Sequence, residues 1–122
     1  MQLERFEELV AKSVEELPEE IQDYLDNVDI VVEDEPTRAQ LKRGKTGKEY
    51  TLFGLYEGIP QTERGSHYGM VVPDRITIFK NSIESVCRND DEIKREIGRV
   101  VRHEIAHHFG ISDDRLEEMG RY

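Results

Sequence analysis

Apolar residues near the start of the chain recur at three- and four-residue spacing among glutamates, which is the pattern of an amphipathic helix. The pattern covers residues 3–17 and stops at Pro18, which removes a backbone donor and interrupts the helix. Pro18 followed by Glu19 and Glu20 favours the start of a second short helix, because proline and acidic side chains suit a first turn. Both helices need a partner that buries their apolar stripes.

A longer helix is predicted over residues 90–109. Asn89, with Glu92 three residues later, forms a capping box at its start. At about 100° per residue, four apolar residues share one stripe: Ile93, Ile97, Val100 and Val101. The same stripe continues through Glu104 and His107, so we expect this face to become polar in its last two turns, leave the core and floor a cleft.

Three segments are predicted to be strands. Residues 28–32 form a short apolar run, residues 50–56 are rich in aromatic and β-favouring side chains, and residues 75–80 alternate with a period of two. We place residues 75–80 at an edge of the sheet, beside the cleft. The charged stretch 33–48 is expected to be a loop with one helical turn, and residues 57–72 hold four Gly or Pro residues, too many for a regular element.

The length and composition of the chain predict one small domain over residues 1–122. Of these residues 36% are hydrophobic, enough for one core layer between helices and a sheet. The formal charge of −10 at pH 7 argues against a nucleic-acid partner, because nucleic-acid binders carry clustered positive charge. Residues 38–48 are a local exception with five Lys or Arg residues, interpreted as a solvated loop, with an anion site as the alternative.

Cys87 is the single cysteine, so it can form no internal disulfide and belongs to no cysteine-rich zinc site; we expect it in the core. No apolar run approaches 20 residues, and no charged-then-apolar leader follows Met1. These features predict a cytoplasmic protein without a membrane partner.

The most specific pattern is HExxHxxGxxD near the C-terminus. His103 and His107 lie one helical turn apart, so both side chains leave one face and can share one Zn²⁺ at ~2.0–2.1 Å. Glu104 can reach a metal-bound water from that surface. Gly110 can adopt a positive φ, end the helix and return Asp113 to the metal as an oxygen ligand. Three protein ligands leave one position open, which distinguishes catalytic from structural zinc.

Neighbouring residues offer alternatives. Asp114 competes with Asp113 for the third ligand position, but Asp114 suits the N-cap of a last short helix, which favours Asp113 as ligand. His108 is expected to be packed, because a helix cannot aim adjacent side chains at one ion. In the Gly- and Pro-rich loop, His67 and Tyr68 can stabilise an oxyanion or orient substrate; a plain surface role is the more ordinary interpretation.

With this motif in place, the chain resembles the small bacterial zincin-like metallopeptidase family, the minimal zincins. The resemblance covers about the second half of the chain and rests on residues 55–60, 62–64, 73–79 and 103–115. It implies an α+β, zincin-like fold in which a short mixed sheet packs against the motif helix and an N-terminal helix.

The resemblance also implies that His103, His107 and Asp113 hold zinc and that Glu104 is catalytic. We therefore expect a zinc metallopeptidase for peptides or unfolded proteins, in which Glu104 takes a proton from zinc-activated water and passes it to the leaving amine. The alternative is a non-proteolytic zinc-binding or regulatory module of zincin fold, since a chain of this size has few elements with which to build subsites. The intact Glu104 favours the enzyme, because a structural site needs no base.

Overall fold

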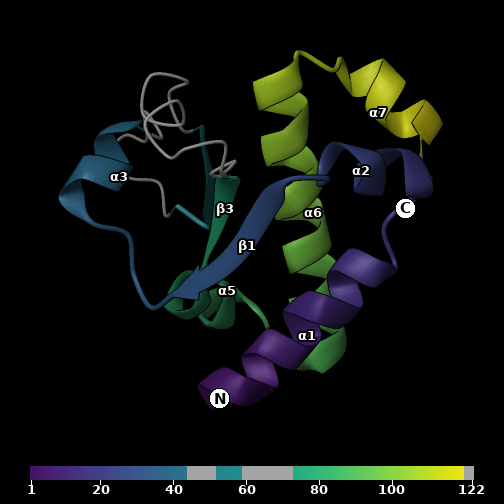
Figure 1. Cartoon of the computed structure of the whole chain (residues 1–122). Coiled ribbons are helices and arrows are strands. Elements are labelled where there is room, and N and C mark those ends of the chain that lie inside the picture. The colour runs from purple at the N-terminus through teal and green to yellow at the C-terminus, as the bar shows by residue number, and fades with distance from the viewer. Residues whose placement is uncertain (44–51, 59–72, 120–122) are drawn as a thin grey trace.

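The computed structural model describes residues 1–43, 52–58 and 73–119. Within these ranges it contains six helices and three strands (Figure 1). The helices are α1 (Leu3–Glu15), α2 (Glu19–Tyr24), α3 (Arg38–Arg43), α5 (Lys80–Val86), α6 (Asp90–Phe109) and α7 (Asp113–Met119). The strands are β1 (Val28–Glu33), β2 (Gly54–Glu57) and β3 (Asp74–Phe79).

The three strands form one mixed sheet in the order β1-β3-β2. β1 runs parallel to β3 with Ile30 opposite Ile76, and β2 runs antiparallel to β3 with Tyr56 opposite Ile76. The prediction of an edge strand at residues 75–80 is therefore wrong: among the strands of the described ranges, β3 is central and β2 is the edge beside α6. The fully buried Ile76 and Ile78 fit this central position, because a strand covered on both sides buries its side chains more completely.

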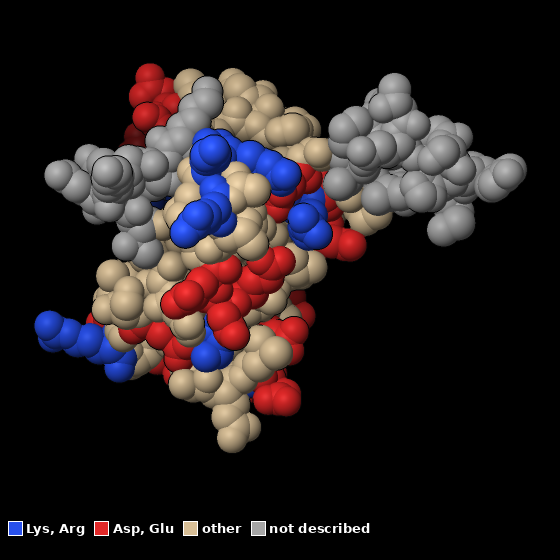
Figure 2. All heavy atoms as spheres, turned by 90° about the vertical axis from the view of Figure 1, so that its left-hand side faces the viewer, with Lys and Arg blue, Asp and Glu red and all other residues tan. Residues whose placement is uncertain are grey.

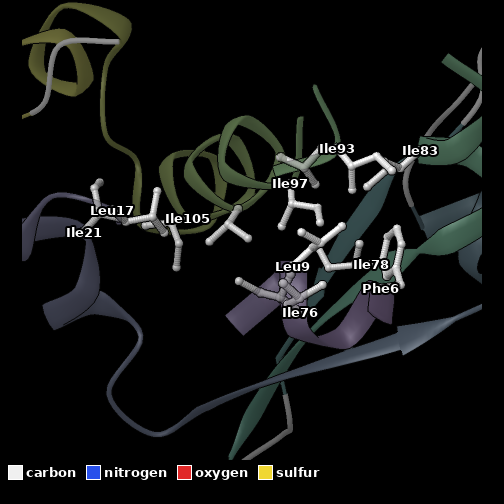
Figure 3. Packing of buried hydrophobic residues seen from close by; sticks show 13 residues of the cluster. Phe6, Leu9, Leu17, Ile21, Ile76, Ile78, Ile83, Ile93, Ile97 and Ile105 are labelled. Atoms are coloured by element: carbon white, nitrogen blue, oxygen red, sulfur yellow. The ribbon is translucent and has the colours of Figure 1, made fainter. Parts of the chain in front are cut away.

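One face of the sheet packs against α1 and α6, and the core lies between these layers (Figures 1 and 3). Figure 3 shows Ile76 and Ile78 of β3 beside Phe6 and Leu9 of α1 and Ile97 of α6. The expected α+β architecture, a short mixed sheet with helices, is confirmed. In the described part of the chain, none of the helices has the length and apolar character needed to cross a membrane.

The long helix has the predicted bounds because both ends carry local signals. Asn89 Oδ1 accepts the Glu92 N–H at 2.9 Å, and Glu92 Oε1 accepts the Arg88 N–H at 2.9 Å. These bonds satisfy donors that the first turn leaves free. Gly110 follows the helix with φ 69°, and the Ile111 N–H returns to the Ala106 carbonyl at 2.9 Å, which is the glycine-based helix ending.

The final turns of α6 carry three rows of side chains, each with four-residue spacing. The buried row holds Ile93, Ile97, Val101 and Ile105. The row that faces β2 holds Val100, Glu104 and His108. The exposed row holds Arg99, His103 and His107. The expectation that Glu104 and His107 continue the buried stripe is wrong, because the core-facing row keeps its four-residue repeat through Ile105 instead.

Two further elements differ from the sequence-based expectations. α5 begins at Lys80, directly after β3, where the sequence predicts the end of a strand and nothing more. Cys87, which follows α5, is half-buried and packs against the core rather than lying inside it. Burial and the nearby Glu96 and Glu92 carboxylates raise the pKa of the Cys87 thiol. The thiol is therefore a weak nucleophile.

β2 approaches α6 closely because residue 54 has no side chain. A Cβ placed on Gly54 would lie 2.5 Å from Val100 Cγ1 and 3.1 Å from the Thr77 carbonyl oxygen. The second neighbour is backbone of the central strand and cannot rotate away. Any side chain at this position therefore pushes β2 away from α6.

Gly54→Ala is expected to lower the free energy of unfolding by about 1–3 kcal/mol, the usual cost of overpacking a close contact. The overpacking outweighs the about 0.5–1 kcal/mol that alanine gains over glycine in backbone entropy. Urea denaturation measures the change. Gly58→Ala is the matched control, because a Cβ there meets its nearest atoms at ordinary distances of 3.6 and 3.8 Å. Equal stability of the two variants would contradict the close approach.

Candidate active site

His103 and His107 leave α6 from one exposed row, one turn apart. Their ring centroids lie 4.5 Å apart, with the ring planes inclined by 42°. Both imidazoles are solvent-exposed, so their nitrogens are accessible to a ligand. The structure therefore brings together the first two predicted metal ligands.

Glu104 lies on the neighbouring row and is held by the backbone of β2. Its Oε1 accepts the Tyr56 N–H at 2.9 Å. The Tyr56 N–H can donate toward α6 because every second residue of an edge strand points its amide away from the sheet. The half-buried Glu104 carboxylate is thereby fixed between the edge strand and the histidine row.

A cleft of about 730 Å³ runs between α6 and β2. Its described lining is Arg43, Leu52, Phe53, Gly54, Leu55, Tyr56, Arg99, Val100, His103, Glu104, His107 and His108. We call it the motif cleft. One wall is the edge strand, and the other consists of the two outer rows of α6, so the HExxH part of the sequence motif lines the cleft.

Tyr56 and His108 form one end of the motif cleft. Their rings stack at a centroid distance of 3.9 Å with an interplanar angle of 16°. The Tyr56 hydroxyl donates to Asp74 Oδ2 at 2.6 Å, which fixes the phenol, and Phe109 meets the His108 ring edge-on at 4.8 Å. His108 is solvent-exposed, and its ring stacks on Tyr56, a residue that sequence reasoning missed.

Arginines from two elements also line the motif cleft. Arg99 precedes His103 by one turn on the same row of α6, and Arg43 is the last residue of α3. Arg43 and Arg75 both contact the buried carboxylate of Glu57, which also accepts the Gln40 amide at 3.3 Å. A hydrogen bond to Glu96 raises the pKa of the Arg99 guanidinium, which stays positively charged.

Asp113 lies beyond the Gly110 turn, at the first residue of α7, and its side chain is exposed. Within the described residues, no three His, Cys, Asp or Glu side chains come together as a metal-binding group, so the structure does not place Asp113 with the two histidines. Its role as third ligand stays a prediction. His103, His107 and Glu104 lie on one helix, so helical geometry sets their relative positions. The position of Asp113 depends instead on the path of the chain after Gly110.

The expected N-cap of the last helix at Asp114 is wrong. Ser112 Oγ accepts the Arg115 N–H at 3.1 Å, and the Ser112 carbonyl accepts the Leu116 N–H at 2.9 Å. Ser112 is therefore the cap, because its short hydroxyl reaches the third amide of the helix. Asp113 and Asp114 both lie in the first turn of α7. His67 and Tyr68, the candidates for substrate contacts, lie outside the described residues.

Comparison with known proteins supports this picture at the level of fold and family. A model of the family described as zincin-like metallopeptidase matches residues 25–121. Among solved structures, a conserved hypothetical protein from Thermo thermophilus is similar, with a TM-score of 0.56 and 23% sequence identity over 89% of this chain and 94% of that chain. No curated protein gives a significant match. At this identity the solved structure shows the fold alone.

Proposed function

The chain belongs to the zincin-like metallopeptidase family, and on that premise we propose that it is a zinc-dependent peptidase that hydrolyses peptide bonds. The observation that carries the proposal is the placement of Glu104. Its carboxylate lies in an open cleft next to a pair of exposed imidazoles and is oriented by the Tyr56 amide. A carboxylate held in this way suits a general base.

The donor set of the site fits zinc chemically. Imidazole nitrogens and carboxylate oxygens are zinc ligands, and His103 and His107 already share one row of a helix. These two residues would hold the ion, with Asp113 as the third ligand that we propose from the motif. Bound zinc supplies a Lewis acid that polarises a carbonyl and lowers the pKa of water.

Glu104 then performs the proton transfers. Its carboxylate takes a proton from the attacking water and delivers it to the nitrogen of the leaving amine. The Tyr56 N–H holds one carboxylate oxygen, which leaves the second oxygen for the water.

The substrate lies along the cleft as an extended peptide. An edge strand binds such a peptide through main-chain hydrogen bonds, with little selection by the side chains it does not touch. Among the described strands, β2 is the edge beside α6, and its main-chain groups other than the Tyr56 N–H, which donates to Glu104, can pair with a peptide. We therefore propose peptides and unfolded protein segments as the substrate class.

Zinc content is expected to depend on His103 and His107 and not on His108. Each ligand histidine changed to alanine removes one of three protein donors, so stoichiometric zinc is lost. His108→Ala is the matched control, because this residue is adjacent in sequence but its ring stacks on Tyr56. Metal analysis after dialysis measures the zinc per chain. Retention of one zinc in both the His103 and the His107 variants would refute the metal site.

The third ligand is tested by a pair of neighbouring substitutions. Asp113→Ala is expected to weaken zinc binding by roughly 100-fold or more, since groups that only hydrogen-bond a ligand already contribute about 10–100-fold. Asp114→Ala is the control with the same charge change in the same turn of α7, and it is expected to leave the affinity within a few-fold. Competition titration with a zinc chelator gives both constants. The reverse order would assign the metal to Asp114.

Glu104→Gln is expected to abolish cleavage while zinc stays bound. The amide oxygen of glutamine can still accept the Tyr56 N–H, so the shape of the cleft is kept, but the base is gone. General-base catalysis contributes about 10²–10⁴-fold to the rate. A peptide-library digest read by mass spectrometry compares the zinc-loaded wild type with the variant.

Two outcomes of that digest contradict the proposal in different ways. Equal cleavage by Glu104→Gln would remove Glu104 from the mechanism. Absence of cleavage by the zinc-loaded wild type across the library would favour the alternative function, a zinc-binding module of zincin fold without peptidase activity.

A further inference from the structure

β1 is the second edge strand of the sheet. Among the described strands the order is β1-β3-β2, so one side of β1 pairs with β3 and the other side has no strand partner. An edge strand presents a row of main-chain donors and acceptors that can pair with a strand of another chain. The surroundings of β1 therefore decide which strand fits there.

The register of the sheet indicates which main-chain groups of β1 point outward. The Phe79 N–H donates to the Phe53 carbonyl at 3.0 Å, so the odd-numbered residues of β3 turn their main-chain groups toward β2 and the even-numbered ones toward β1. In a parallel pair, Ile76 then bonds to the two neighbours of Ile30, the residue opposite it. The N–H and C=O groups of Ile30 and Val32 therefore point away from the sheet, and they have no hydrogen-bond partner within the described residues.

An apolar groove lies beside this edge, between α1 and β1 (Figure 1). It has a volume of about 350 Å³, and its described lining is Glu7, Val10, Ala11, Val14, Ile30 and Val32. Ile30 and Val32 pack against the core and remain partly exposed, and the small Ala11 is exposed. A strand added to β1 would point every second side chain toward this groove, because side chains alternate between the two faces of a sheet.

The opposite face of β1 is acidic. Asp29 and Glu33 lie on the other face from Ile30, and neither carboxylate has an ion pair or hydrogen bond within the described ranges. Arg75 is opposite Asp29 on β3, but its guanidinium contacts Glu57. β1 ends on the left-hand side of Figure 1, and Figure 2, which looks onto that side, shows a band of Asp and Glu below a group of Lys and Arg.

The two faces of β1 indicate the chemistry of the partner. On one face, an added strand meets the apolar groove; on the other, it meets Asp29 and Glu33. Opposite charges across two paired strands are stabilising and like charges are destabilising. A second copy of this chain would bring its own Asp29 and Glu33 to the same edge and a further formal charge of −10, so self-pairing is disfavoured.

We propose that the outward edge of β1 and the groove between α1 and β1, together called the β1 surface, bind an extended segment of another protein as an added strand. Apolar and basic side chains alternate in this segment. The apolar ones fill the groove, and the Lys or Arg ones pair with Asp29 and Glu33. The β1 surface lies at the opposite edge of the sheet from β2 and the motif cleft, so this interaction does not rest on the proposed peptidase function.

The probe is a labelled peptide in which Val and Lys alternate, with the length of β1, six residues. It is added to Glu104→Gln protein, so that cleavage does not interfere, and binding is followed by fluorescence anisotropy. A peptide with the same composition but with Val and Lys in two blocks is expected to bind about tenfold more weakly, because it keeps the charge and loses the alternation. A peptide of alternating Val and Glu is expected to bind more weakly still.

Main-chain pairing is tested by N-methylation, which removes the amide donors on one edge of the peptide. In an antiparallel pair, the residue opposite Ile30 exchanges both hydrogen bonds with it and points its side chain into the groove, so the Val amides face β1. In a parallel pair the Lys amides face β1 instead. Methylation of one set is expected to weaken binding by about tenfold or more, and methylation of the other set to leave it within a few-fold, because only one edge of the peptide pairs.

Two pairs of substitutions in the same background locate the binding site. Ala11→Lys places a charge in the groove and is expected to weaken binding about tenfold. Ala39→Lys is the matched control, the same change at an exposed alanine of α3 that does not line the groove. Asp29→Asn is expected to weaken binding about threefold, as loss of one cross-strand charge pair does. Glu15→Gln, at an exposed site on α1 outside the groove lining, is its control.

The other outcomes each overturn a stated part of the proposal. Equal binding of the peptide and both of its N-methylated forms refutes strand addition. Equal binding of the Val/Lys and Val/Glu peptides refutes the basic preference. Equal weakening by Ala11→Lys and Ala39→Lys assigns the binding to the general field of the protein, and no weakening by either places the peptide elsewhere. A dimer found by sedimentation and dissociated by Ala11→Lys assigns the β1 surface to a second copy of the chain instead.

Discussion

The close approach of β2 to α6 is the constraint on which the candidate site depends. Gly54 lies against Val100, Tyr56 donates to Glu104, and Gly58 lies beside His108. From one of these contacts to the next, the position advances two residues along β2 and four residues along α6. Two strand residues span about 6.6 Å and four helix residues about 6 Å, so strand and helix stay in step across the motif. A displacement at Gly54 is therefore transmitted to the carboxylate of Glu104.

Features that depend on neighbours in sequence were predictable. The bounds of α6 follow from the Asn89 cap and the Gly110 ending, and the pairing of His103 with His107 follows from helical geometry. Features that depend on distant residues were not. The Tyr56 amide and Glu104 are 48 residues apart in the chain, and nothing in the period of either segment indicates their contact.

Strand order and helix phase show the same limit in physical terms. Residues 75–80 alternate like an edge strand, but pairing with β1 on one side and β2 on the other makes β3 central. A single apolar stripe predicts a helix with two faces, one buried and one exposed. α6 has three faces, which are turned toward the core, toward β2 and toward the cleft. Helical periodicity places Glu104 in the apolar stripe, because it does not distinguish a side chain that faces a strand from one that faces the core.

The three faces of α6 also explain how an acidic protein places arginines beside its cleft. Net charge averages over the whole surface, while a ligand in a cleft experiences the few side chains that line it. The exposed row that continues from His103 toward the start of α6 reaches Arg99, and Arg43 contacts Glu57 at the end of β2. The described walls of the cleft are a four-residue strand and the last turns of one helix, so few side chains are in reach of a ligand and each of them has a large share in its recognition.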